Sequence, residues 1–280
     1  PDGIELVFWA HTPAGPLRLV FPGQQAVCFL TRDTRLDPGQ FPGITFERRR
    51  LALEDLQGNA VDGLYFRQQQ QLQRLRPLVS QAGIRLLESD IKPADRFLME
   101  RFITAAFSAE GEVTQRREYR ELINPRLKPA DLQPSFHCLS LDIETDALDG
   151  EILSIAFCGQ GLEQILMQGS AEQWQTDLPV AWFPDEPHLL RAFLQRISEL
   201  DPDLLIGWNL INFDLDYLER RCRNYRIPFS LGRNQETAAI LQPQQSGQPR
   251  IASIPGRVAL DGIDNLRAAV RQDPDVMLVG

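Results

Sequence analysis

Cysteine and lysine are scarce in this chain. The four cysteines among 280 residues show no Cys-x-x-Cys spacing, so neither a zinc site nor a disulfide framework is indicated. We therefore expect reduced thiols and a cytoplasmic protein. Only two of the 29 basic residues are lysine, Lys92 and Lys128, and arginine supplies the rest.

Long hydrophobic runs are also missing. No apolar stretch approaches the roughly 18 residues that a membrane span needs, and no signal peptide is visible. No membrane partner is expected. The chain begins at Pro1 without a methionine and stops at Gly280, which favours a fragment of a longer protein.

The chain also lacks an excess of positive charge, since its net charge is −9 at pH 7. Residues 1–136 hold 18 basic and 17 acidic residues, whereas residues 137–280 hold 11 basic and 21 acidic ones. Free-standing nucleic-acid binders are usually basic. The chain alone should therefore bind DNA weakly and lose that binding steeply with added salt.

The most informative segment that is present runs from Leu139 to Thr145. Its apolar residues alternate with polar ones, so a strand would bury the apolar set and place Asp142 and Glu144 together on the other face. Two carboxylates on one small patch repel each other unless a cation lies between them. Because Mg²⁺ prefers carboxylate oxygen, the pattern predicts a divalent metal site around Asp142.

A second acidic position follows a short buried strand at residues 203–207. The segment from Asn209 to Asp214 then leads into a helix that carries Leu215 and Leu218. Asp214 could cap this helix by accepting its first backbone N–H groups, or it could join the metal site, and both roles are compatible. Asn209 could cap a turn or contact a substrate.

The order of elements predicts a ribonuclease-H-like fold for residues 137–280. Three antiparallel strands are expected, the second entered by a hairpin at Asp149-Gly150. A crossover helix from Glu186 to Asp201 and a fourth strand follow. Asp261 closes a strand-like run and is interpreted as a helix cap.

Residues 1–136 are predicted to form a separate mixed α/β domain. A hairpin opens it, and a strand-helix-strand unit is expected to end at residues 84–87. Three prolines between residues 124 and 134 mark the boundary. Further along, residues 231–255 are rich in Gln, Pro and Gly and predict a surface hairpin or loop.

Several blocks together resemble the family-B DNA polymerases. Asp142-x-Glu144 is similar to the first motif of their 3′→5′ proofreading exonuclease, and Asn209-x3-Phe213-Asp214 is similar to the second. Further matching blocks at residues 61–65, 90–103 and 256–263 occur in the family's order. The resemblance implies a polymerase N-terminal domain (1–136) followed by a ribonuclease-H-like exonuclease domain (137–280).

One family feature is not found. Proofreading exonucleases of this type use a third motif, Tyr-x3-Asp or His-x4-Asp, that supplies a fourth carboxylate. No tyrosine here has the required aspartate, and the match between His137 and Asp142 precedes the first motif. We therefore expect an exonuclease domain truncated at its C-terminal end, and a weakly active or inactive chain.

The resemblance also implies the chemistry. Asp142, Glu144 and Asp214 would be both catalytic residues and ligands of two Mg²⁺ ions, for which Mn²⁺ could substitute. Asn209 and Phe213 would contact the substrate, although Phe213 is favoured as a core aromatic. The implied partners are a single-stranded 3′ DNA end and the template, whereas dNTPs and a sliding clamp would need the missing polymerase domain and C-terminus.

Two alternatives remain open at this point. The chain could be a non-catalytic nucleic-acid-binding or scaffolding module that keeps the fold with an incomplete site. A stand-alone exoribonuclease of the same superfamily is less favoured, because the blocks that precede Asp142 match polymerases. The first interpretation, part of a DNA-directed DNA polymerase with proofreading activity and a nucleoid association in the cytoplasm, is preferred.

Overall fold

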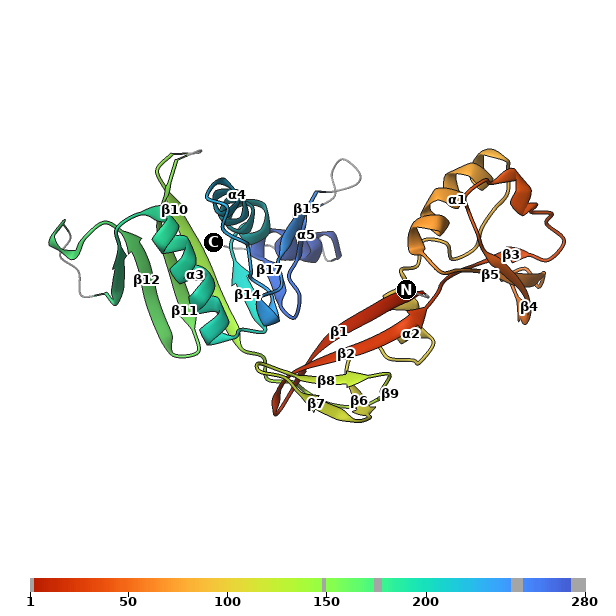
Figure 1. Cartoon of the computed structure of the whole chain (residues 1–280), viewed down its shortest axis with the longest axis horizontal. Helices are drawn as coiled ribbons and strands as arrows, with labels where there is room; N and C mark the ends of the chain where they lie inside the picture. Colours follow the sequence, from red (N-terminus) through yellow and green to blue (C-terminus); the bar gives the residue numbers. More distant parts are fainter. Residues whose placement is uncertain (1–2, 148–149, 174–177, 243–248, 273–280) are drawn as a thin grey trace. The chain divides into compact units, whose positions relative to one another are not determined.

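A computed structural model describes residues 3–147, 150–173, 178–242 and 249–272 (Figure 1). The chain divides into two compact units. The first contains residues 1–8 and 17–133, and the second contains residues 9–16 and 134–280. The predicted hairpin residue Asp149 lies outside the described residues.

The first unit contains three small sheets, except that residues 9–12 and 15–16 of its first two strands fall in the second unit. A four-stranded sheet has the order β1 (Ile4–Thr12), β2 (Gly15–Gln24), β8 (Arg120–Ile123), β7 (Val113–Gln115). A three-stranded antiparallel sheet has the order β3 (Ala26–Thr31), β5 (Ala60–Phe66), β4 (Glu47–Glu54). The third sheet pairs β6 (Phe107–Glu110) with β9 (Arg126–Pro129).

Helix α1 (Gln69–Gln81) covers the three-stranded sheet. Its Leu72, Leu75 and Val79 follow helical spacing and are buried in the same core as Leu64 and Phe66 of β5. The unit also contains α2 (Pro93–Met99) and the short 3₁₀ turn η1 (Pro38–Gln40).

The predicted strand at residues 84–87 was wrong. Only Leu87 reaches β3, through a single antiparallel bridge to Phe29 in which each backbone N–H donates to the other residue's carbonyl. The apolar run there packs Ile84 and Leu86 against the core without extending the sheet.

The second unit is built on a six-stranded mixed sheet. Its order is β13 (Val180–Phe183), β12 (Leu162–Gln168), β11 (Ile152–Gly159), β10 (Cys138–Thr145), β14 (Leu204–Gly207), β17 (Val258–Asp261). Strands β10, β11 and β12 are antiparallel neighbours, and β14 runs parallel to both β10 and β17. This confirms the three-stranded antiparallel start and the fourth strand of the ribonuclease-H-like prediction, and the structure shows that the fourth strand is parallel to β10.

Helix α3 (Glu186–Leu200) is the predicted crossover between the antiparallel strands and β14, and it packs on β11 and β12 (Figure 1). It begins after Asp185, whose carboxylate accepts the backbone N–H of His188 at 3.0 Å. It ends at Asp201, which adopts a left-handed conformation with φ of 42°. Leu189, Leu190 and Phe193 are fully buried and join the core under the sheet.

The remaining elements follow β14. They are the π-helix η3 (Leu210–Leu215), α4 (Asp216–Asn224), the hairpin of β15 (Ala239–Leu241) with β16 (Ile251–Ser253), and α5 (Gly262–Gln272). The 3₁₀ turn η4 (Arg233–Gln235) also follows β14, whereas the 3₁₀ turn η2 (Ala171–Gln173) lies between β12 and β13. The β15–β16 pair confirms the hairpin predicted within residues 231–255. No helix in the described ranges is both long and apolar enough to cross a membrane.

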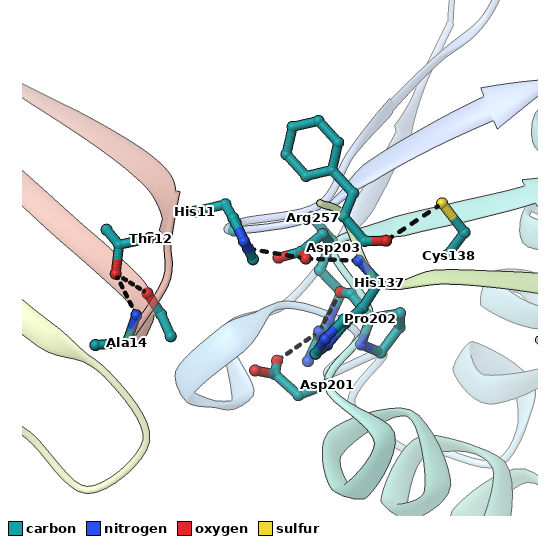
Figure 2. Close-up of polar contacts among 12 residues, drawn as sticks. His11, Thr12, Ala14, His137, Cys138, Asp201, Pro202, Asp203 and Arg257 are labelled. Atoms are coloured by element: carbon teal, nitrogen blue, oxygen red, sulfur yellow. Dashed lines mark hydrogen bonds and ion pairs between the residues drawn. The ribbon is translucent and has the colours of Figure 1, made fainter. Parts of the chain in front are cut away.

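A polar cluster fixes the amino-terminal end of β14 within the second unit (Figure 2). Asp203 is buried, and its carboxylate accepts the backbone N–H of His137 at 2.9 Å and pairs with Arg233 at 2.8 Å. Figure 2 shows the imidazole of His11 pointing at the same carboxylate, with Nδ1 at 3.0 Å from Oδ2. Asp203 thus joins the segment Trp9–Pro16 to the sheet.

Candidate active site

The predicted carboxylates of β10 lie where the alternation places them. Leu139, Leu141 and Ile143 are buried, whereas Asp142 and Glu144 are exposed on the opposite face. This face of β10 is therefore acidic and open to solvent, which is what a cation site on the strand requires.

The end of β14 controls where the second acidic segment goes. A Cβ atom on Gly207 would lie 2.7 Å from the carbonyl oxygen of Leu141, so only glycine allows this close approach to β10. Asn209 then adopts a left-handed conformation with φ of 60°, and its carbonyl accepts the backbone N–H of Phe213 at 2.9 Å. These two residues turn the chain directly into η3.

Asp214 lies within η3 and is 1% exposed. Strand β14 pairs with β10 only as far as Ser140, so the edge of β10 is unpaired beyond that point. The Oδ1 atom of Asp214 accepts the backbone N–H of Ile143 at 3.1 Å. This hydrogen bond places the Asp214 carboxylate beside β10 at the residue between Asp142 and Glu144.

Of the two roles left open for Asp214, this arrangement does not support that of a cap for the following helix. Its carboxylate binds β10, 71 residues earlier in the sequence, and the start of α4 at Leu215 has no side-chain cap. The junction is a π-helix rather than a plain helix start. Such wide turns are rare and are frequent at functional sites.

The electrostatics of Asp214 follow from this position. Burial is the largest effect and the charge of nearby Asp142 is the next, and together they raise the pKa of Asp214 to about 7. The hydrogen bond from Ile143 opposes the shift, while the charge of Asp261 adds a little to it. Asp142 and Asp214 therefore form a mutually repelling pair that a bound cation would stabilise.

Glu144 lies on the same face of β10 as Asp142 but is not among the charges that shift the pKa of Asp214. Within the described ranges, no three His, Cys, Asp or Glu side chains form a group that could hold a metal ion. The structure therefore brings Asp142 and Asp214 together and leaves Glu144 outside a three-carboxylate cluster. The donors of the pair are carboxylate oxygens, the chemistry that suits Mg²⁺ or Mn²⁺.

Asn209 and Phe213 belong to the same turn as Asp214. The side chain of Asn209 makes no capping hydrogen bond, so its amide is not used to start η3. Phe213 is half-buried against the core and lies with its ring centroid 5.7 Å from that of Tyr217. Phe213 thus has the packing expected of a core aromatic.

Asp261 supports the site from the end of β17. It is 3% exposed, and its carboxylate accepts the backbone N–H groups of Ile263 and Asp264 at 2.9 and 3.2 Å, which confirms the predicted helix cap. Its other oxygen accepts the N–H of Ile211 at 2.9 Å. The sequence did not show this link, because 50 residues separate the two partners and no local pattern marks it.

The sequence matches a known protein family. The family described as DNA polymerase family B, exonuclease domain, matches residues 85–271. The chain belongs to DNA polymerase family B.

Individual relatives agree with this assignment. The chain is 32% identical to DNA polymerase II of Escherichia coli over 280 residues, which is 96% of this chain and 34% of that protein. It is 32% identical to a DNA polymerase of Thermococcus hydrothermalis over 150 residues, 51% of this chain and 8% of that protein. The chain thus spans about a third of the length of its E. coli relative.

The fold is also similar to a solved structure. The family B DNA polymerase of the archaeon Pyrobaculum calidifontis superposes with a TM-score of 0.68 at 17% identity, covering 99% of this chain and 36% of that one. This similarity concerns the fold, and it extends over both compact units.

Proposed function

We propose that this chain carries carboxylates of a 3′→5′ proofreading exonuclease in an enzyme similar to DNA polymerase II. The observation that supports this most strongly is the coupled pair of Asp142 and Asp214, which unites the two sequence motifs through the hydrogen bond to Ile143. Ordinary folding gives no reason to bury a carboxylate beside another one. Binding of a cation that takes part in phosphodiester cleavage would explain this arrangement.

Each carboxylate has a separate role in this proposal. Divalent metal ions bound here would lower the pKa of the attacking water and neutralise charge on the leaving oxygen. Asp142, exposed on β10, would be a ligand of these ions. Glu144 and Asp214 would also be ligands, Glu144 serving activation of the attacking water and Asp214 serving neutralisation of the leaving oxygen.

The neighbouring residues would place the DNA. Asn209 would donate from its uncommitted amide to the terminal nucleotide, and Phe213 would limit the pocket for the 3′ end from its packed position on the core. The proposed substrate is a single-stranded 3′ DNA end. The proposed polymerase reaction, with its dNTPs, template contacts and clamp, would use parts of the longer relatives that this chain does not span.

A non-catalytic DNA-binding module is the second candidate. Two observations favour it: the sequence contains no Tyr-x3-Asp motif after Asp214, and no three-carboxylate group occurs among the described residues. In this case the fold would hold DNA without cutting it.

A nuclease assay separates the two candidates. The chain and a version extended toward the length of its E. coli relative are incubated with 5′-labelled single-stranded DNA and Mg²⁺. We expect the extended version to shorten the DNA stepwise from its 3′ end, with activity abolished by Asp142→Ala. If both versions bind the DNA but leave it intact, the chain is a non-catalytic DNA-binding module and not part of an exonuclease. Parallel assays with RNA test the exoribonuclease alternative.

A further inference from the structure

The first unit contains a pocket that the proposed exonuclease does not use. It has a volume of about 550 Å³ and lies where β3, β4 and β5 meet the loop that follows β3. Four arginines line it: Arg32, Arg35, Arg48 and Arg50. No aromatic side chain is among its described lining residues.

A buried aspartate organises two of these arginines. Asp62 of β5 is 4% exposed, and its two oxygens accept from Nε of Arg32 at 3.0 Å and from Nε of Arg48 at 2.8 Å. Burial works against ionisation of Asp62 and is the largest single effect, but the hydrogen bonds from both arginines together lower its pKa. Asp62 therefore stays ionised and holds both guanidinium groups in place.

Backbone carbonyls also hold the guanidinium groups of Arg32 and Arg48 in place. Arg48 also donates to the carbonyls of Thr34 and Arg32, at 2.9 and 2.7 Å. Arg32 donates to the carbonyl of Leu51 at 2.7 Å. Two cations are thus fixed at the wall of the pocket before any ligand arrives, which lowers the entropy lost on binding.

The other two arginines are available to a ligand. Arg35 and Arg50 are exposed, and neither guanidinium has a hydrogen-bonding or ionic partner among the described residues. Arg50 lies directly opposite Asp62 in the β4–β5 register, so it projects from the same place on the sheet. Of the remaining acids, Asp37 already accepts the N–H of Gly39 at 2.9 Å.

We propose that this pocket binds a phosphoryl group through Arg35 and Arg50, with Arg32 and Arg48 supplying fixed positive charge behind it. Arginine forks match phosphate oxygens in geometry and charge. Four arginines face three aspartates, one of which is buried and already paired, so the pocket favours an anion. Without an aromatic ring, the pocket is suited to the phosphate of a nucleotide rather than to stacking of its base.

Two sources could supply this phosphate: a nucleic-acid strand, or a free phosphoanion. The experiment uses the 280-residue chain in metal-free buffer, so that cleavage makes no contribution. Binding of a short fluorescein-labelled oligothymidylate is followed by anisotropy, and binding of pyrophosphate by calorimetry. The test variant is Arg35→Ala/Arg50→Ala, and the charge-matched control is Arg74→Ala/Arg76→Ala, which removes two exposed arginines from α1.

We expect the pocket variant to weaken binding of at least one probe by about 10- to 100-fold, the effect of losing two charge-assisted contacts. The control variant should change binding of either probe by less than about threefold, because Arg74→Ala/Arg76→Ala removes only charge distant from the pocket. Asp33→Asn, which removes a lining acid, should strengthen binding. Unfolding temperatures confirm that every variant is folded.

The pattern of losses identifies the source. Loss of the oligonucleotide alone assigns the pocket to a nucleic-acid backbone, and loss of pyrophosphate alone assigns it to a free phosphoanion. Loss of both shows general recognition of phosphate. Equal binding by the pocket variant and the control, for both probes, would overturn the proposal whatever the nuclease assay shows.

Discussion

At the residue scale, the site depends on one buried carboxylate. Asp214 is excluded from solvent and lies close enough to Asp142 for the charge of one to raise the pKa of the other. When no cation is bound and both carboxylates are ionised, the burial of Asp214 and its repulsion by Asp142 lower the free energy of unfolding. The protein therefore gives up stability at this position, as expected where binding rather than folding has set the arrangement.

This cost predicts that Asp214→Asn stabilises the metal-free protein. The folded state keeps the Asp214 proton up to a pH of about 7, whereas the unfolded state loses it near its ordinary pKa of 3.8. The folded state binds more protons between these values, so stability falls as pH rises from about 4 to 7 and then stays level. The asparagine variant lacks this decline and can still accept the Ile143 N–H.

Urea unfolding in EDTA measures the effect. We expect the variant to exceed the wild type by ~1–3 kcal/mol at pH 8, with a much smaller difference near pH 4. The matched variant Asp142→Asn removes the exposed partner and should show part of the same gain. Equal stability of wild type and Asp214→Asn at both pH values would mean that Asp214 carries no such cost.

At the scale of elements, η3 is held between two strands by two carboxylates. Asp214 reaches from η3 to β10, and Asp261 reaches from β17 to the start of η3 and to α5. The π-helix is therefore fixed at both ends by side chains rather than by its own turn alone. This support keeps Asp214 beside Asp142.

Removing the second carboxylate should loosen both helices. Asp261→Ala leaves three backbone N–H groups without their acceptor, in a region that is mostly buried. We expect a loss of ~2–4 kcal/mol in thermal or urea unfolding. Asp264 is an acid of the same first turn that is partly exposed and pairs with the exposed Arg267 at 3.4 Å, so Asp264→Ala should cost less than ~1 kcal/mol. Similar losses in the two variants would show that the hydrogen bonds accepted by Asp261 add no stability of their own.

The sequence predicted elements better than the contacts between them. The alternation of β10, the crossover helix α3 and the cap at Asp261 are local patterns, and the structure confirms them. The π-helix was missed because its wider turn leaves no spacing signature in six residues. The link between Asp214 and Ile143 was also missed, since it depends on where β14 stops along β10.

At the scale of the whole chain, the second unit is assembled from segments far apart in sequence. Residues 9–16 belong to it although they lie more than a hundred positions before its main part. The sequence did not show this, because the contact between His11 and Asp203 joins residues far apart in the chain and leaves no local pattern. Asp203 is the residue that connects these segments through His11 and His137.

This connection predicts a pH-dependent loss of stability in Asp203→Asn. Burial opposes ionisation of Asp203 most, but hydrogen bonds from the His137 N–H and from Arg233 bring its pKa below the ordinary value. A carboxylate with a lowered pKa stabilises the fold above its unfolded pKa, and that contribution disappears as pH falls through its folded pKa. The variant should therefore be ~2–4 kcal/mol less stable than the wild type at pH 7.

The difference between the two proteins should narrow as pH falls below about 3.8, where the unfolded carboxylate takes up its proton while the folded one is still ionised. Asp201→Asn serves as the control, since the Asp201 side chain is 38% exposed and pairs with the same Arg233. A stability difference that does not change between pH 7 and pH 3 would show that the charge of Asp203 is not what matters.

The most direct test of the central claim is the pKa of the Asp214 carboxyl, measured by NMR with and without Mg²⁺. The coupled pair predicts a pKa of about 7 in EDTA, a lower value in Asp142→Asn, and a fall of at least about two units in the wild type when Mg²⁺ is added. An ordinary pKa near 4 in EDTA, unchanged by Mg²⁺ or by Asp142→Asn, would contradict the assignment of this pair as a divalent-cation site.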